Sequence, residues 1–306
     1  MTIAFISHPD CALHEMGPGH PESPARLSSI QDHLLSSGLD FILQHHDAPL
    51  ASREQLSRVH DPEYVEHIFL TAPEEGQVWL DPDTCMNPHS LSAALRAAGA
   101  VVLGVDLVMS EQANAAFCNV RPPGHHAEHN KAMGFCIFNN IAVGAAHALQ
   151  AHQLERVVIV DFDVHHGNGT EDIFRDVPEI LLCSTFQHPF YPHTGSHVES
   201  EHIINVPLPA GTDGQAFRAA VESHWLPRLE AFQPELILIS AGFDAHVEDD
   251  MANLNLLEQD FAWVTREIKT IADKYAQGRI VSALEGGYAL SALGRSVAAH
   301  LDGLLG

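Results

Sequence analysis

The feature that most constrains the fold is a series of short apolar runs, separated by stretches with helical periodicity. Several runs are too continuously apolar for strands with one face in water, which favours parallel strands covered on both faces. The predicted strands are Ile3–Ser7, Ala115–Asn119, Val157–Asp161, Ile180–Ser184, Leu236–Ser240 and Ile280–Leu284, and the predicted helices are Leu91–Met109, Asn139–His152, Gln215–Leu229, Leu256–Tyr275 and Leu290–Leu304. This alternation predicts a three-layer α/β/α fold with a mainly parallel, doubly wound sheet.

Domain organisation follows from the absence of any repeat, low-complexity tract or Ser/Gly/Pro-rich linker in the sequence. We therefore expect one domain over residues 1–306, and the 45% hydrophobic content is enough to build its core. In open α/β sheets, ligands bind beyond the carboxyl ends of the strands. The residues that follow each apolar run are therefore the first candidates for a functional site.

The charge balance is strongly acidic, with 40 acidic and 15 basic residues and a formal net charge of −25. Such a chain repels phosphate backbones, so we expect no nucleic-acid partner. The same field attracts cationic molecules, although an acidic surface also simply promotes solubility. The N-terminus has no secretory pattern, and no run of eighteen apolar residues occurs, which predicts a cytoplasmic protein without a membrane anchor.

Five cysteines are widely spaced and form no Cys-x-x-Cys pair. Their odd number and spacing favour neither a disulfide framework nor a cysteine zinc site.

Candidate metal ligands occur at the end of the run VVIVDFDVHHGNGT, where Asp161, Asp163 and His165 alternate with apolar residues. Strand periodicity places all three on one face. An aspartate and an imidazole two residues apart supply the oxygen and nitrogen ligands that zinc binds.

Asp244 follows the apolar run LILISAGFD and should reach the same edge of the sheet. It would complete a three-ligand set with an open coordination position, which is typical of a catalytic metal. An aspartate after a strand also commonly caps the next helix, and the sequence pattern alone does not separate the two roles.

Two further motifs carry groups suited to acid–base and electrostatic catalysis. His125 and His126 lie in RPPGHHAEHN and could transfer protons near neutral pH. Most of the 23 histidines in the chain need no such role. Tyr288 follows two glycines in LEGGY and could donate a hydrogen bond to an oxyanion, although such turns are more often structural.

Six motifs follow one another along nearly the whole chain, and together they resemble the histone deacetylase family. They are GHPESPARL (19–27), RPPGHHAEHN (121–130), GFCIFNN (134–140), DFDVHHGNGT (161–170), SAGFDAH (240–246) and LEGGY (284–288). The forms RPPGHHA and GHPE are similar to the class II branch and its bacterial relatives, which include acetylpolyamine amidohydrolases.

The resemblance implies an arginase-deacetylase fold with one catalytic Zn2+. It assigns Asp163, His165 and Asp244 as the zinc ligands, which agrees with the set derived from the strand ends. It further implies that His126 is the general base and acid, and that the Tyr288 hydroxyl polarises the acyl carbonyl. In addition, His125 would be a protonatable partner oriented by Asp161.

The resemblance also implies a structural K+ beside the zinc strand, held by main-chain oxygens of Asp161, Asp163 and His165 with Ser184 and Thr185. For the substrate, it implies an acyl-lysine tunnel with aromatic walls and an aspartate that accepts from the substrate backbone. The corresponding residues are Gly134, Phe135, Tyr191 and Met251, with either Asp81 or Asp83 as the acceptor.

Two positions depart from the patterns of particular branches of the family. Asn168 stands where class I relatives have an aspartate, and the loss of a negative partner should make His126 less basic. Met251 falls where a polyamine-selective relative has a glutamate, which favours a substrate without a distal ammonium group. The neighbouring acids Glu248, Asp249 and Asp250 could instead bind the ammonium groups of a polyamine, so an acetylpolyamine substrate stays an alternative.

The sequence thus predicts a zinc-dependent amidohydrolase that deacylates acetyl-lysine or a related acyl-lysine. The alternative substrate is an acetylated putrescine, cadaverine or spermidine. A catalytically silent binding protein and an arginase-like binuclear manganese enzyme are the rival classes. The sequence fixes neither the acyl chain length, nor the native metal, nor whether the chain forms a homo-oligomer.

Overall fold

The computed structural model describes residues 2–196 and 200–306. Its centre is an eight-stranded sheet in the order β2-β1-β5-β10-β9-β6-β7-β8, in which every neighbouring pair is parallel. The strands are β1 (Ile3–Ser7), β2 (Leu43–Asp47), β5 (Ala115–Cys118), β6 (Val157–Asp161), β7 (Ile180–Gln187), β8 (Ile203–Leu208), β9 (Leu236–Ala241) and β10 (Ile280–Leu284). A separate antiparallel hairpin is formed by β3 (Val78–Asp81) and β4 (Thr84–Met86).

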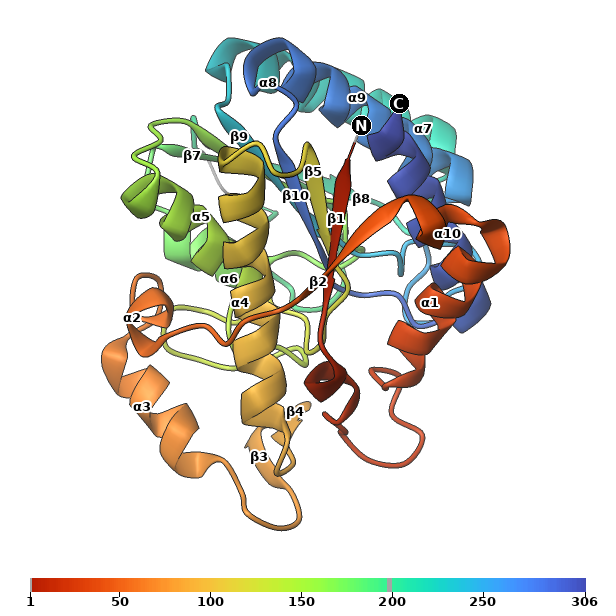
Figure 1. Ribbon diagram of the computed structural model, residues 1–306. Coiled ribbons are helices and arrows are strands. Elements are labelled where there is room, and N and C mark those ends of the chain that lie inside the picture. Colours follow the sequence, from red (N-terminus) through yellow and green to blue (C-terminus); the bar gives the residue numbers. More distant parts are fainter. Residues whose placement is uncertain (1, 197–199) are drawn as a thin grey trace.

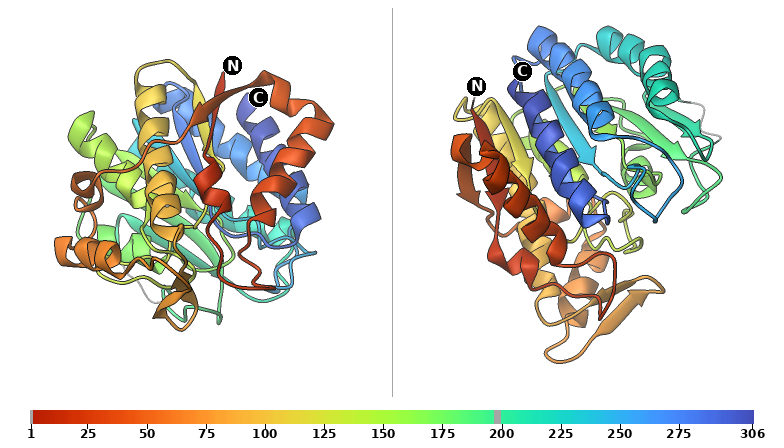
Figure 2. Two further views of the ribbon diagram at one scale, coloured as in Figure 1. Left: turned by 60° about the horizontal axis from the view of Figure 1, so that its bottom comes forward. Right: turned by 90° about the vertical axis from the view of Figure 1, so that its right-hand side faces the viewer.

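Helices cover both faces of the sheet, so the three-layer α/β/α prediction is confirmed (Figure 1). One layer contains α4 (Ser90–Met109) and α5 (Asn140–Ala151), and the right view of Figure 2 faces the other layer. That second layer contains α1 (Ala25–Ser37), α7 (Gly214–His224), α8 (Leu226–Phe232), α9 (Glu258–Tyr275) and α10 (Leu290–Leu305). The short helices are α2 (Arg53–Leu56), α3 (Pro62–Thr71), α6 (Asn168–Phe174) and two 3-10 turns, Pro9–Ala12 and Leu39–Ile42.

The core is divided into two apolar clusters by the sheet, because successive side chains of a strand point to opposite faces. In β6, Val157 and Ile159 pack in the cluster that includes α4 and α5, whereas Val158 and Val160 pack in the cluster that includes α9 and α10. Burial on both faces explains why the central strands are continuously apolar in the sequence.

All six predicted strands are present, but the two edge strands β2 and β8 were not predicted. Each edge strand pairs with one neighbour only, and its side chains are partly exposed. β2 has the sequence LQHHD, and β8 contains a proline, so neither shows the apolar run of a central strand. Edge strands therefore leave a weak signal in the sequence.

The helix predicted at Gln215–Leu229 was wrong as a single element, because the structure has α7 and α8 with a break at Trp225. Pro227 lies in the first turn of α8 and cannot continue the hydrogen-bond ladder of α7. The Trp225 side chain at this break is fully buried.

Helix α4 is long and apolar enough to cross a membrane by length and composition alone. In this fold 72% of its most apolar stretch is buried, and it packs against β1, β5, β10 and α5. Its hydropathy is therefore that of a helix in the protein core.

The carboxyl ends of the parallel strands all lie at one edge of the sheet, on the side of the β3–β4 hairpin (Figure 1). The left view of Figure 2 turns this edge forward and shows the loops gathered over it. Every chemically suggestive motif of the sequence lies in these loops or at a strand end beneath them.

Candidate active site

Three metal-ligand side chains converge at the carboxyl ends of the neighbouring strands β6 and β9. Asp163 and His165 follow β6, Asp244 follows β9, and all three are buried. His165 Nδ1 lies 3.1 Å from Asp163 Oδ1 and 3.3 Å from Asp244 Oδ2. Tetrahedral zinc with bonds of about 2.0–2.2 Å separates its ligand atoms by roughly 3.3 Å, so this spacing suits such an ion.

The ligands lie just beyond the regular strand, since β6 ends at Asp161. The alternation nevertheless continues, because Phe162 and Val164 pack in the core while Asp163 and His165 face the site. The Val164 amide donates to Asp244 Oδ1 at 3.0 Å and so ties the two ligand-bearing loops together. The helix-cap alternative for Asp244 is therefore wrong, and the next helix begins only at Glu258.

The cradle around the two carboxylates fits a cation. Within the described residues, Asp244 Oδ2 is buried and has no hydrogen-bond donor. A Cβ at Gly286 would lie 2.0 Å from this oxygen, and a Cβ at Gly242 would lie 2.0 Å from Asp163 Oδ2, so only glycine fits at both positions. Burial lowers the pKa of His165, but the Asp163 and Asp244 carboxylates outweigh it and raise the pKa to about 10. The cluster thus favours an added positive charge, which a divalent ion supplies.

His126 is held in one tautomer by a chain of hydrogen bonds. Asn168 Nδ2 donates to Glu128 Oε1 at 2.8 Å, which turns Asn168 Oδ1 toward His126 Nδ1 at 2.7 Å. Nδ1 is then the donor, and Nε2 keeps its lone pair. Burial lowers the pKa of His126 well below its usual value, and the positive charges on His125 and His165 lower it further.

His125 has the opposite environment. Its Nδ1 lies 2.9 Å from Asp161 Oδ2, and its Nε2 lies 3.8 Å from Asp163 Oδ1. Burial lowers the pKa of His125, but the two carboxylates outweigh it and raise the pKa well above the usual value. The two imidazoles lie with ring centroids 4.1 Å apart, so neighbouring histidines hold a charged and a neutral ring. Such a separation of pKa values is typical of acid–base pairs in active sites.

A cavity of about 260 Å³ opens onto these groups and has mostly apolar walls. The rings of Phe135 and Tyr288 meet edge to face at 6.1 Å, and Tyr191 packs edge to face on His126 at 5.3 Å. The lining residues are Asp83, Pro123, His125, His126, Gly134, Phe135, His165, Phe190, Tyr191, Met251, Gly286 and Tyr288.

Of the two candidate acceptor aspartates, only Asp83 is among the residues that line the cavity. The Gly134 amide donates to Asp83 Oδ1 at 2.9 Å, and Thr84 Oγ1 donates to the same oxygen at 3.0 Å. Asp81 Oδ1 accepts from the Asp83 amide at 2.8 Å and so shapes the hairpin turn. The structure therefore favours Asp83 for contact with a substrate.

The residues predicted for a monovalent ion lie next to the metal ligands but outside the cavity lining. Asp161 and Ser184 are paired in the register of β6 and β7, and Thr185 follows in β7. All three are buried, and the Ser184 hydroxyl has no hydrogen-bond partner within the described residues.

Three residues near the site were not identified from the sequence. Phe190 stacks on His165 with ring centroids 5.6 Å apart, and its signal was the aromatic pair Phe190-Tyr191. Glu285 Oε2 accepts from the Gly124 and His125 amides at 2.6 and 3.1 Å, and burial raises the pKa of Glu285 to about 7. Glu285 lies within the motif LEGGY, but the motif itself does not indicate this contact.

Asp249 is the third of these residues and is almost fully buried. Its Oδ2 accepts from the Tyr288 amide at 2.6 Å and from the Ala289 amide at 2.9 Å, while its Oδ1 accepts from the Met251 amide at 3.1 Å. This carboxylate therefore fixes the backbone of Tyr288 against the loop that carries Asp244. From the sequence, Asp249 was predicted only as one of three neighbouring acids and not as a backbone anchor.

A three-layer α/β fold with a buried Asp/His/Asp cluster next to a cavity lined by a histidine pair is typical of a metal-dependent hydrolase. The family model described as "Histone deacetylase domain" matches residues 20–304. The chain therefore belongs to the histone deacetylase family and is a hydrolase of that family.

Individual relatives agree with this assignment. The chain is 37% identical to the "Histone deacetylase-like amidohydrolase" of Pseudomonas aeruginosa, over 93% of this chain and 81% of that protein. It is also 37% identical to "Histone deacetylase 14, chloroplastic" of Arabidopsis thaliana, over 96% and 75%. The crystal structure of the HDA15 HD domain superposes with a TM-score of 0.91 at 32% identity, covering 99% of this chain and 89% of that one. The fold is thus the arginase-deacetylase fold.

Proposed function

We propose that this protein is a zinc-dependent deacylase that hydrolyses the side-chain amide of acetyl-lysine or a related acyl-lysine to a free amine and a carboxylate. One observation carries the proposal. Three groups with complementary chemistry meet at one mostly apolar cavity. They are the Asp163, His165 and Asp244 cluster, which suits a cation, His126 with its Nε2 lone pair, and the Tyr288 phenol.

Bound zinc would be held by Asp163, His165 and Asp244, and it would supply Lewis acidity and a lowered pKa for a water molecule. His126 Nε2 accepts the proton of the attacking water, because its Nδ1 proton is committed to Asn168. Tyr288 donates its hydroxyl proton in a hydrogen bond to the developing oxyanion. His126 then returns the proton to the nitrogen of the leaving amine, and the C–N bond breaks.

His125 supports this proton transfer through its charge. A protonated His125 beside His126 disfavours a second positive charge, which keeps His126 neutral at rest. Asp161 holds His125 in place through its Oδ2. Asp161 therefore acts through His125, although it lies on the same strand face as two of the ligands.

The shape of the cavity supports a substrate with a long, uncharged alkyl arm near its acyl end. Phe135, Phe190 and Tyr191 provide aromatic walls, and Met251 adds an apolar side chain. Asp83 is the one carboxylate among the lining residues, and it suits the backbone amides of a lysine peptide.

Two of the three acids that would favour an acetylpolyamine substrate, Glu248 and Asp249, have other partners in the structure. Asp249 is committed to three backbone amides, and Glu248 Oε1 lies 2.5 Å from Arg295 Nη2. Asp250 is exposed. This arrangement favours an acyl-lysine over a substrate with a distal ammonium group.

A structural K+ at Asp161, Ser184 and Thr185 is part of the proposal. The support is the buried Ser184 hydroxyl, which has no hydrogen-bond partner in the described part of the chain and lies next to strand-end carbonyls of β6. Nucleic acid is not among the proposed partners, because a net charge of −25 repels phosphate backbones.

The two rival classes have less support. A silent binding protein needs no histidine pair with separated pKa values, yet this chain has one. Within residues 2–196 and 200–306, one three-ligand cluster meets the cavity through His165, and the other lies on α4 and at the end of α5. A binuclear centre in the cavity would need more ligands than these.

The deciding experiment is a fluorogenic acetyl-lysine assay on purified protein, with chelator and with zinc added back. We expect release that stops with chelator and returns with zinc, and metal-independent release or none would contradict the proposal. Acetyl-lysine peptides, longer acyl-lysines and acetylated putrescine or spermidine should then be compared at equal concentration. A higher kcat/KM for an acetylpolyamine would overturn the substrate assignment while leaving the chemistry intact.

A further inference from the structure

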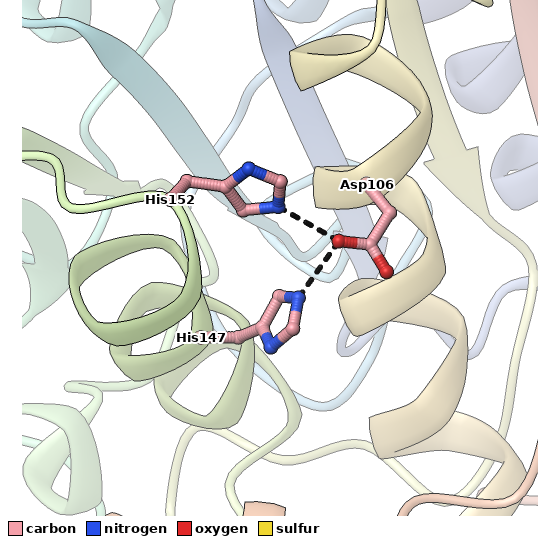
Figure 3. A group of neighbouring side chains, drawn as sticks. All are labelled: Asp106, His147 and His152. Atoms are coloured by element: carbon pink, nitrogen blue, oxygen red, sulfur yellow. Dashed lines mark hydrogen bonds and ion pairs between the residues drawn. The ribbon is translucent and has the colours of Figure 1, made fainter.

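A second group of metal-ligand side chains lies away from the cavity, where α4 packs on α5. Asp106 extends from α4, His147 extends from α5, and His152 is the residue that ends α5 (Figure 3). Asp106 Oδ1 lies 2.8 Å from His147 Nε2 and 2.7 Å from His152 Nε2. None of these three residues lines the active-site cavity.

The arrangement converges on one point. Both imidazoles present the same ring nitrogen to the same carboxylate oxygen, with ring centroids 5.4 Å apart and planes at 78°. Asp106 Oδ2 accepts no hydrogen bond from the described residues, although it could have shared the two donors. Figure 3 shows the two rings pointing toward Asp106 from neighbouring positions of one helix end.

We propose that Asp106, His147 and His152 form a binding site for a divalent first-row transition ion, with Zn2+ as its probe, which links α4 to α5. Two imidazole nitrogens and one carboxylate oxygen are ligands that Zn2+, Ni2+ and Cu2+ share, whereas Mg2+ and Ca2+ prefer oxygen alone. The proposal goes beyond deacylation and does not depend on it.

The ligand set can open to the size of an ion. Tetrahedral zinc needs ligand atoms roughly 3.3 Å apart, so Asp106 must withdraw by about 0.5 Å from the two nitrogens. The Asp106 side chain is 49% exposed and free to move, whereas the His147 side chain is only 9% exposed and fixed. The exposed side also leaves room for water to complete the coordination.

Arg58 opposes binding of the ion, so removing Arg58 should strengthen the binding. Its Nη1 lies 3.0 Å from His147 Nδ1, so Nδ1 accepts and the Nε2 proton points to Asp106. A metal on Nε2 would move the ring proton to Nδ1, where it faces the guanidinium. Arg58 has an alternative partner, because its Nη2 donates to Glu54 Oε1 at 3.1 Å.

The test is a calorimetric Zn2+ titration of protein that already carries one equivalent of zinc, repeated on variants. We expect the wild type to bind one further ion per chain, and Asp106→Asn and His152→Gln to lose that event. His224→Gln is the matched control, because His224 is an exposed histidine on α7 outside both clusters. Arg58→Ala should bind the second ion about tenfold more tightly, since it removes a competing donor and charge.

Equal second-ion binding by the wild type and Asp106→Asn, or no second event in the wild type with excess Zn2+, would overturn the proposal. Looser binding by Arg58→Ala would also count against it, and misfolding cannot mimic the expected tightening. Circular dichroism checks that each variant is folded. The titration needs no substrate, so a failed deacylase assay leaves it unaffected. If the cavity takes no zinc, a single bound ion should disappear with Asp106→Asn and persist in Asp244→Asn.

Discussion

Two clusters of aspartate and histidine in this protein have similar donor atoms and very different surroundings. Beside the cavity, Asp163 and Asp244 are fully buried, and backbone amides of Val164 and Gly286 hold their oxygens apart, while His165 faces the cavity. On the helices, Asp106 is half exposed, and its oxygen rests directly against two imidazoles. The first cluster has the spacing of a metal site before any ion arrives, and the second must open to accept one.

The electrostatic cost of the two clusters differs as well. Burial and the nearby Asp163 carboxylate raise the pKa of Asp244 to about 6. The negative charge of this cluster is therefore unfavourable unless a proton or a cation balances it. Asp106 keeps a lowered pKa, because hydrogen bonds from His147 and His152 outweigh its partial burial. A buried charged cluster lowers folding stability, so its presence indicates a functional role. A half-exposed cluster lowers stability little, so only an experiment can reveal its role.

The largest expected effect comes from the cavity cluster. Asp244→Asn should lower kcat/KM by at least about 10³-fold, because a metal ion contributes several kcal/mol to the reaction. Metal analysis of the variant should show weakened binding of the catalytic zinc. Wild-type activity and zinc content in Asp244→Asn would break the assignment of this cluster as the catalytic one.

Tyr288→Phe should lower kcat by about 10²–10³-fold, the usual loss for an oxyanion donor, while zinc stays bound. The phenol lines the cavity and is not one of the metal ligands. Single-turnover kinetics combined with zinc analysis separates the two effects. A variant that turns over at the wild-type rate would refute the role of the hydroxyl.

Asp249→Ala should lower kcat by roughly 10–10²-fold with a small change in KM, because the backbone of Tyr288 loses its anchor and the phenol is misplaced. The neighbouring Asp250 is exposed, so Asp250→Ala is the matched control. An equal loss in both variants would point to general damage of the loop.

The pH dependence should respond to Asn168. Burial and the charges on His125 and His165 keep the pKa of His126 low, so the base is neutral down to acidic pH. Asn168→Asp, combined with Glu128→Gln to avoid two adjoining carboxylates, places a negative partner on Nδ1 and should raise the pKa of His126. The acidic limb of kcat/KM then moves to higher pH, and an unmoved or lowered limb would exclude His126 as the group that titrates.

The smallest effect is expected at the helix cluster. Asp106→Asn should leave kcat/KM unchanged within about twofold, and without metal it should cost under about 1 kcal/mol of folding stability at neutral pH. Since the pKa of Asp106 is lowered in the folded state, this stability is present above pH ~4 and is lost as the pH falls below it. Urea unfolding of the wild type and Asp106→Asn, at neutral pH and below pH ~4, measures this difference in stability. A large loss of activity in Asp106→Asn would show that the two clusters are coupled.

The sequence identified most of the candidate site because its residues sit at the ends of strands with strong patterns. Asp163, His165 and Asp244 each follow a continuously apolar run, and parallel strands bring their carboxyl ends to one edge. Phe190 and Asp249 were missed because they lie in irregular loops without a periodic signal. Asp249 in particular acts through backbone amides, which every residue type except proline provides.

By itself, the sequence determined the three-layer fold, the central strands and the family, since apolar periodicity and ordered motifs are local properties of the chain. It also predicted the Asp163, His165 and Asp244 cluster that the structure brings together. Only the tertiary structure decided which of Asp81 and Asp83 lines the cavity, which tautomer His126 adopts and which acids near Met251 are already paired. It also brought Asp106 beside His147 and His152, 41 and 46 residues away in the chain. These outcomes depend on contacts between segments distant in the sequence, and no local pattern records them.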